Sequence, residues 1–292
     1  MNADEIDRLK RLTTVALFSD DKLLNTLVLK GGNALSLVHN MTSRASFDLD
    51  FSMEGEFAPN ELADYAERIE YRLTQAFTPA GYVVFDVKLE PKPENVSDEL
   101  KDFWGGYNLE FKAIPAGRYR ELKGDLKAIR REAIPPKPGG KARFEIDISR
   151  HEYCSGKQAV EIDHFTVYVY TPSMVVCEKL RAICQQRPAY TAFVKKHRAP
   201  RARDFFDICE AIRRFDIDVA APANLDTIKN MFRAKRVPLK LLRDIESDRE
   251  FHRQDWDAVR DTVDPGIVLR DFDFYFDFVR GLCKEVANAL AD

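Results

Sequence analysis

The chain has 292 residues, 45% of them hydrophobic, and a formal net charge of -3 at pH 7. This length allows one elaborate domain or two cooperating domains. No stretch approaches the roughly 20 apolar residues that span a membrane, and the charged N-terminus lacks the apolar run of a signal peptide. We therefore expect a globular, cytoplasmic protein with no membrane partner.

Five cysteines are scattered along the chain, at Cys154, Cys177, Cys184, Cys209 and Cys283. Their number is odd, no two form a CxxC pair, and they form no group with histidine that has the spacing of a zinc site. We expect them to be reduced and mostly buried, with no bound zinc.

The N-terminal region predicts a helix, a strand, a tight turn and a second helix. The first helix ends near Phe18, and a short apolar strand over 27–29 leads into the turn at Gly31-Gly32. Asn33 can cap the helix that follows, which continues to about His39.

Apolar and polar residues alternate without exception over 46–52, which predicts a half-buried strand. Asp48 and Asp50 then project from one face, about 7 Å apart at ~3.3 Å per residue. Like charges side by side on a strand repel, so this pair indicates a cation site more strongly than a solvated sheet face, which is the alternative.

Later segments continue the mixed pattern to about residue 170. Residues 59–77 have helical spacing. Further strands are predicted over 81–88, 107–114, 143–149 and 165–170. From Thr171 onward almost every segment is helical. We predict an α+β fold, with an α/β domain over 1–170 and a helical domain over 171–292.

The strand over 143–149 offers a third acid. Its alternation places Glu145 and Asp147 on one face, and either can serve; we choose Asp147. Two divalent ions about 4 Å apart, shared by Asp48, Asp50 and this acid, can activate a nucleophile and hold the leaving oxygens of a phosphoryl transfer.

The Gly31-Gly32 turn supplies a second part of such a site. Glycines let the backbone approach a phosphate, and the following helix offers free N–H groups and the positive end of its dipole. A Gly-Gly pair alone is a weak signal. Here the turn leads from a strand into a helix, and it is followed by a DxD strand and by a single acid on a distant strand. This combination resembles the polymerase-β-like nucleotidyltransferases, whose fold is a mixed sheet with flanking helices.

Four ordered segments extend this match. LKGGNAL at 29–35 and RASFDLDF at 44–51 resemble the AbiEii-type nucleotidyltransferase toxins of bacterial toxin-antitoxin and abortive-infection systems. EKLRA at 178–182 resembles the lysine-bearing helix of that family, and RARDFFDI at 201–208 resembles its last motif, RDxxD. The resemblance covers residues 27–210.

The resemblance implies a set of site residues. The metal ligands are Asp48, Asp50 and Asp147. The other catalytic residues are Lys179, as a triphosphate contact, and Asp207. The nucleotide-binding residues are Lys30, Gly31, Gly32, Asn33, Ser46, Lys112 and Asp204, with Lys112 near the third acid. The order of catalytic roles stays open among four acids, Glu145, Asp147, Asp204 and Asp207. Asn33 stands where the wider superfamily often has serine, so the preferred nucleotide stays open.

The two C-terminal motifs also have ordinary structural interpretations. Lys179 can be a lysine on an exposed helix face. Asp207, four residues after Arg203 on one helix, can form a surface ion pair worth only a few tenths of a kcal/mol.

The predicted function is transfer of a nucleotide from an NTP to an acceptor, with Mg²⁺ or alternatively Mn²⁺. Residues 112–143 carry ten Lys or Arg against three acids, and 195–203 form a second basic cluster. Together with the resemblance, this positive charge indicates RNA as the acceptor, at the 3′ end of tRNA. The resemblance also implies that the protein is a toxin with a cognate antitoxin. Two alternatives are a protein-modifying nucleotidyltransferase and a non-catalytic RNA- or partner-binding protein with the same fold.

Overall fold

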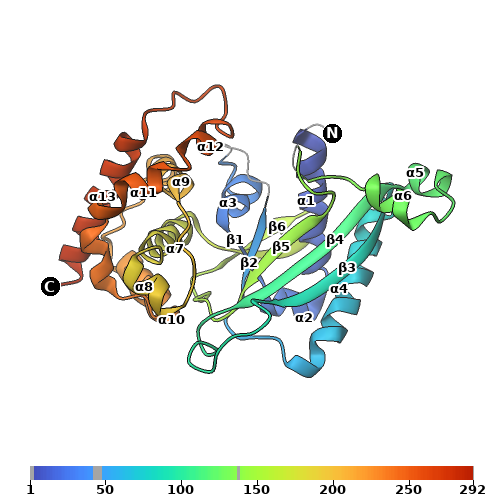
Figure 1. Cartoon of the computed structure of the whole chain (residues 1–292), viewed down its shortest axis with the longest axis horizontal. Coiled ribbons are helices and arrows are strands. Elements are labelled where there is room, and N and C mark those ends of the chain that lie inside the picture. The colour runs from blue at the N-terminus through green and yellow to red at the C-terminus, as the bar shows by residue number, and fades with distance from the viewer. Residues whose placement is uncertain (1–2, 42–47, 137–138, 292) are drawn as a thin grey trace. The chain divides into compact units, whose positions relative to one another are not determined.

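A computed structural model describes residues 3–41, 48–136 and 139–291 (Figure 1). It contains a seven-stranded sheet in the order β3-β4-β5-β2-β1-β7-β6. The strands are β1 (Val28–Lys30), β2 (Leu49–Ser52), β3 (Tyr82–Lys92), β4 (Gly106–Pro115), β5 (Phe144–Ser149), β6 (Gln158–Ile162) and β7 (Phe165–Val169). β2 pairs with β5 and β1 with β7 in parallel, and the other neighbours are antiparallel. The fold is therefore α+β with a mixed sheet, as predicted.

Two long helices, α1 (Ala3–Phe18) and α4 (Leu62–Phe77), pack on one face of this sheet (Figure 1). Phe77 meets Phe111 of β4 edge to face with ring centroids 5.6 Å apart, and Phe18 lies 6.0 Å from Phe51 of β2. All four rings are buried. Because side chains alternate along a strand, the neighbours of Phe51 and Phe111 point to the opposite face, which carries the polar residues of the candidate site.

The chain divides into two compact units. The described residues up to Asn33 and over 48–169 form one, here called the sheet unit, and those over 34–41 and 170–291 form the other, the helical unit. The turn Gly31–Asn33 (α3) thus belongs to the sheet unit, whereas the π-helix Ala34–Val38 (η1) that follows it belongs to the helical unit.

The sheet unit has further short helices: α2 (Asp21–Thr26), η2 (Pro59–Glu61), α5 (Ala116–Glu121) and α6 (Leu126–Arg131). The helical unit contains α7 (Pro172–Cys184), α8 (Pro188–Phe193), α9 (Ala202–Phe215), α10 (Pro222–Ala234), η3 (Leu239–Asp244), η4 (Glu246–Asp248), α11 (Arg249–Arg253), α12 (Trp256–Arg260) and α13 (Phe272–Ala289). Its core is aromatic: Phe205 of α9 stacks on Phe276 of α13 with centroids 5.1 Å apart.

Several local predictions are confirmed. The first helix ends at Phe18, and residues from 172 onward contain only helices and loops among those described. The structure adds that Thr171 caps α7, since its hydroxyl accepts a hydrogen bond from the backbone N–H of Met174. All five cysteines are reduced and buried. No helix of the described part of the chain is long and apolar enough to cross a membrane.

Other local predictions need correction. The helix begins at Gly31, directly after β1, so Asn33 is a buried residue inside it and does not cap it. β2 begins only at Leu49, which leaves Asp48 just before the strand. β3 continues beyond Lys88 to Lys92, past a bulge after Phe85 that the alternation pattern did not signal.

Candidate active site

A row of polar residues crosses five strands on the face opposite α1 and α4. The register places Lys30 of β1 beside Asp50 of β2, and Asp50 beside Asp147 of β5. From Asp147 the row continues to Asn108 of β4 and Glu90 of β3. Register partners share a face and lie on strands about 4.8 Å apart. Two acids from distant motifs are therefore nearest neighbours in what we call the carboxylate row.

The glycine turn packs directly against this row. Gly31 has φ +69°, in the left-handed region that favours glycine. A Cβ atom at this position would lie 2.8 Å from Oδ2 of Asp50, closer than side chains approach one another. Gly31 is thus required both by its backbone conformation and by the carboxylate that lies against it.

Two buried side chains fix the turn to the sheet. The amide nitrogen of Asn33 donates a hydrogen bond to the backbone oxygen of Asp48 at 2.5 Å. Nζ of Lys30 lies 3.1 Å from Oγ of Ser149 and 3.7 Å from Oε1 of Glu152. Lys30 is only 7% exposed, so its positive charge is held in place beneath the turn, next to Asp50 in the register.

Asp147 is half exposed and already holds a cation. Nζ of Lys92 lies 2.6 Å from its Oδ1, and both side chains are more than half exposed to solvent. Such exposed pairs contribute about 0–1 kcal/mol, so a more strongly bound cation can displace the lysine. Glu145, the other candidate for the third acid, pairs instead with Arg143. The register therefore favours Asp147 as the partner of Asp50.

Asp48 stands apart from this pair. It is exposed and comes one residue before Leu49, which pairs with Ile146 in the first register pair of β2 and β5. If the pairing continued back by one residue, Asp48 would lie beside Glu145, not beside Asp147. Within the described residues, no group of three or more His, Cys, Asp or Glu side chains is placed to hold a metal ion. The structure thus joins Asp50 and Asp147 as neighbours, and does not gather all three predicted ligands at one point.

Lys112 lies on the same face but away from the carboxylate row. It is four residues from Asn108 along β4, or about 13 Å at ~3.3 Å per residue. Its Nζ is 2.8 Å from Asp86, which also accepts two hydrogen bonds from Arg130. The hydrogen bond from Arg130 is the main reason that the pKa of Asp86 falls to about 2, and Lys112 adds to the effect. The lysine beside the third acid is Lys92, which no motif indicated.

The helical unit holds the remaining predicted residues in a buried cluster. Nζ of Lys179 on α7 lies 2.7 Å from Asp204 and 2.9 Å from Asp207, both on α9. Arg201 pairs with Asp204 at 2.5 Å. Burial raises the pKa of Asp204, but the charges of Arg201 and Lys179 outweigh it and hold that pKa below its usual value.

This cluster corrects both structural interpretations of those motifs. Lys179 is 8% exposed, so it does not lie on an exposed helix face. Asp207 is 2% exposed and binds Lys179, so it is not half of a surface ion pair with Arg203. Of the other predicted residues, Gly32 lies in α3 and Ser46 falls outside the described residues.

The α+β fold, with acidic neighbours on two central strands and a glycine turn that leads into a helix, defines the class of protein as a nucleotidyltransferase. A family model described as "Nucleotidyl transferase AbiEii toxin, Type IV TA system" matches residues 15–278. The chain therefore belongs to the AbiEii family of nucleotidyltransferase toxins of type IV toxin-antitoxin systems, as its motifs predicted.

Solved structures show more distant similarity. JHP933 from Helicobacter pylori aligns over 99% of this chain and 93% of its own, with 17% identity and a TM-score of 0.47. An antigenic nucleotidyltransferase-like protein from Paracoccidioides brasiliensis aligns over 81% of this chain and 94% of its own, with 13% identity and a TM-score of 0.36. The search of curated proteins gave no match.

Proposed function

We propose that this protein transfers a nucleoside monophosphate from an NTP to a hydroxyl of an RNA, in a reaction that depends on Mg²⁺. The observation that carries the proposal is the register pair Asp50–Asp147, which lies directly beside the Gly31 turn. Adjacent carboxylates repel one another, and a divalent cation bound between them would offset this repulsion. The turn would supply backbone N–H groups for phosphate at the same place.

The residues of the row suit magnesium. Mg²⁺ is usually bound by one or two carboxylates, and its remaining positions are filled by water and substrate phosphates. Asp50 and Asp147 would supply those carboxylates, whereas Asp48, which lies just before β2, enters as a third ligand through the family resemblance alone. Mn²⁺ has the same oxygen preference and is the alternative ion. When bound, the ion would offset the phosphate charge and lower the pKa of an acceptor hydroxyl.

The turn and Lys30 would hold the triphosphate. The acceptor oxygen forms a bond to the α-phosphorus while the bond to the bridging oxygen breaks, and pyrophosphate leaves. The hydroxyl proton passes to a carboxylate of the row. Asp147 is suited to that step because it is half exposed and its partner among the described residues is the exposed side chain of Lys92.

Lys179, Asp204 and Asp207 enter the proposal through the family resemblance. Their buried ion pairs join α7 to α9, a structural role that explains the cluster without a ligand. A contact between Lys179 and the triphosphate would require the ammonium group to share its hydrogen bonds with phosphate. We therefore assign these residues a supporting part in the activity.

The acceptor follows from the family and from charge. By the resemblance it is the 3′ end of tRNA, so that the modification would stop translation, and a cognate antitoxin would restrain the toxin. Ten basic residues over 112–143 provide the positive charge that a polynucleotide needs.

Purified protein incubated with α-labelled NTPs, Mg²⁺ and total RNA tests the proposal. We expect the wild-type protein to transfer label to RNA and the Asp50→Asn variant to transfer none. Label on the protein fraction would support protein modification. RNA binding without any transfer, under all four NTPs and either metal, would support a non-catalytic binding protein.

A further inference from the structure

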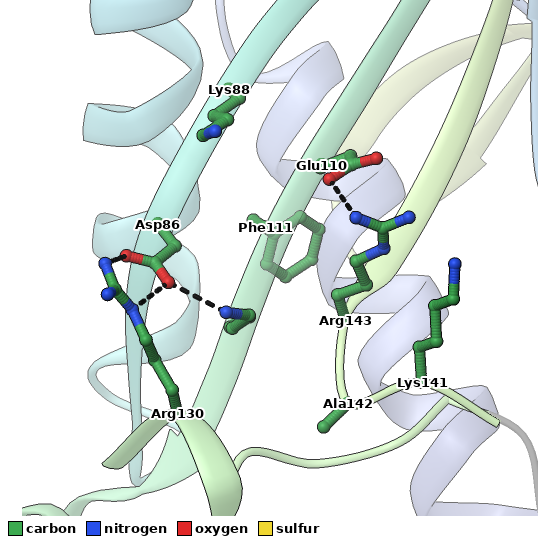
Figure 2. Close-up of a pocket in the computed structure, with 9 residues that line it drawn as sticks. Asp86, Lys88, Glu110, Phe111, Arg130, Lys141, Ala142 and Arg143 are labelled. Carbon is green, nitrogen blue, oxygen red and sulfur yellow. Dashed lines mark hydrogen bonds and ion pairs between the residues drawn. The ribbon is translucent and has the colours of Figure 1, made fainter. Parts of the chain in front are cut away.

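A basic pocket lies on the same sheet face as the carboxylate row. Its volume is about 580 Å³, and its walls come from β3, β4, α6 and the segment that leads into β5 (Figure 2). The charged residues that line it are Lys88, Lys112, Arg130, Lys141 and Arg143, against Asp86 and Glu110. Five cations against two carboxylates give this pocket a local charge of +3, whereas the chain as a whole carries -3.

The register shows how near this pocket lies to the carboxylate row. Glu110 of β4 is the partner of Lys88 on β3 and of Glu145 on β5. Lys88, Glu110 and Glu145 therefore form a second row on the same face, next to the carboxylate row. The two rows are separated by two residues along each strand, or about 7 Å at ~3.3 Å per residue. The pocket therefore begins one step along the strands from the proposed metal ligands.

Three of the five cations are held in position by carboxylates. Lys112 and Arg130 both bind Asp86. Arg143 binds Glu110 at 2.8 Å (Figure 2) and also pairs with Glu145 of β5. A lysine has three donors and an arginine five, so each of these side chains keeps donors that its carboxylate does not use. The pairs fix the positions of the cations without using up their capacity for hydrogen bonds.

The other two cations are uncommitted. Lys88 and Lys141 are exposed, and neither forms an ion pair within the part of the chain that the structure describes. Like charges gathered in one hollow are unfavourable unless an anion enters it. Among the described residues of the lining, Phe111 is the one aromatic side chain, and it is fully buried and stacks on Phe144 at 4.7 Å, so it offers no exposed ring to a base.

We propose that this pocket binds backbone phosphates of the RNA acceptor, a few nucleotides from the end that reacts at the carboxylate row. The inference rests on the proposed function for the reacting end. Positive charge without an exposed aromatic ring among the described lining residues favours contacts with the sugar-phosphate backbone over contacts with particular bases. A track of cations that starts one strand row from the reaction centre would guide a flexible RNA end to it. The pocket thus contributes affinity for any RNA strand, and sequence preference arises elsewhere.

The test uses the full-length protein with Lys88→Gln/Lys141→Gln. These lysines make no ion pair with any residue that the structure describes, so the change removes two charges without exposing a described buried partner. Lys240→Gln/Lys284→Gln is the matched control, because both of those lysines are exposed and form no ion pair among the described residues. The probe is a fluorescent single-stranded oligouridylate, and its anisotropy is measured at increasing KCl concentrations.

We expect the pocket variant to bind the probe roughly tenfold more weakly than the control, with a salt slope that is shallower by about 1. In the transfer assay its KM for RNA should rise by a similar factor, while its KM for NTP and its kcat at saturating RNA stay unchanged. Lys88→Arg/Lys141→Arg should bind like the wild type, because it keeps both charges.

Three results would overturn the inference: unchanged probe binding and RNA KM in the pocket variant, an increase in its KM for NTP alone, or label transferred to an acidic protein with the same dependence on the two lysines. The first leaves the transferase intact and removes only the pocket. Conversely, weaker probe binding by the pocket variant, in a protein that transfers no nucleotide, would support the pocket and refute the proposed function.

Discussion

The two units of this protein each contain a cluster of acids and lysines from the family motifs, and the clusters differ in how their charges are balanced. In the carboxylate row, Asp147 is half exposed, and its ion-pair partner among the described residues is the exposed Lys92. In the helical unit, Lys179 is buried between Asp204 and Asp207. The exposed Lys92 can give way to an added cation, whereas Lys179 is enclosed with its two partners. Acids from one set of motifs can therefore form an open charge pair with a lysine in one unit and a buried one in the other.

Asp50→Asn should have the largest effect. It keeps the shape of the side chain but removes one of the two neighbouring charges, and a metal ion contributes several kcal/mol to such a transition state. Nucleotide transfer should fall roughly a thousandfold. The urea unfolding midpoint should change little, because Asp50 is only part-buried and asparagine keeps its shape and hydrogen-bonding oxygen. Loss of the folded state, seen as a much lower midpoint, would place Asp50 with the structural cluster.

Lys179→Met should show the opposite pattern. Removal of one partner from a buried ion pair leaves an uncompensated charge and costs about 3–5 kcal/mol. Urea denaturation followed by circular dichroism should show this loss in the free energy of unfolding. The combined variant Lys179→Met/Asp207→Asn should recover part of it. A stable Lys179→Met variant with no transferase activity would instead move Lys179 into the reaction.

Gly31→Ala should have an intermediate effect on both stability and activity. The φ of +69° disfavours alanine by about 1–2 kcal/mol, and the new Cβ would press on Asp50 at 2.8 Å. Gly55→Ala is the control, since a Cβ there meets nothing within 4 Å. Thermal unfolding and transfer rates of the two variants should differ clearly. Equal values would mean that the turn adapts and does not position the carboxylate.

Lys92→Ala should have the smallest effect on stability, below about 1 kcal/mol, because the Lys92–Asp147 pair is exposed. Its effect on metal affinity should be more informative. The variant removes the described lysine that competes with the metal ion for Asp147, so less Mg²⁺ should be needed for half-maximal transfer. A Mg²⁺ titration of the reaction rate measures this, and an increased requirement would mean that Lys92 helps to hold the substrate.

Those features of the candidate site that depend on residues close together in the sequence could be predicted from the sequence. Alternation along two strands placed Asp50 and Asp147 on polar faces, and the order of motifs identified the family. Alternation could not show that these strands are parallel neighbours with the two acids in register, because strand pairing joins distant segments. The match across β2 and β5 became visible only in the folded sheet.

Other features were missed because no local signal exists for them. The side chain of Lys92 reaches Asp147 only because β3 continues past the bulge after Phe85 to Lys92. The burial of Lys179 depends on how α7 packs on α9, and a lysine in an isolated helix pattern looks exposed. The predicted role of Asn33 as a helix cap failed because the helix starts without a break after β1, so the amide side chain is free to hold Asp48 instead.

The central claim is that Asp50 and Asp147 together hold a divalent cation with the triphosphate. Mn²⁺ binding followed by electron paramagnetic resonance, with a non-hydrolysable NTP analogue present, tests it most directly. The account predicts protein-bound Mn²⁺ in the wild type, and strongly reduced binding in both Asp50→Asn and Asp147→Asn. Binding of equal affinity in all three proteins would contradict it.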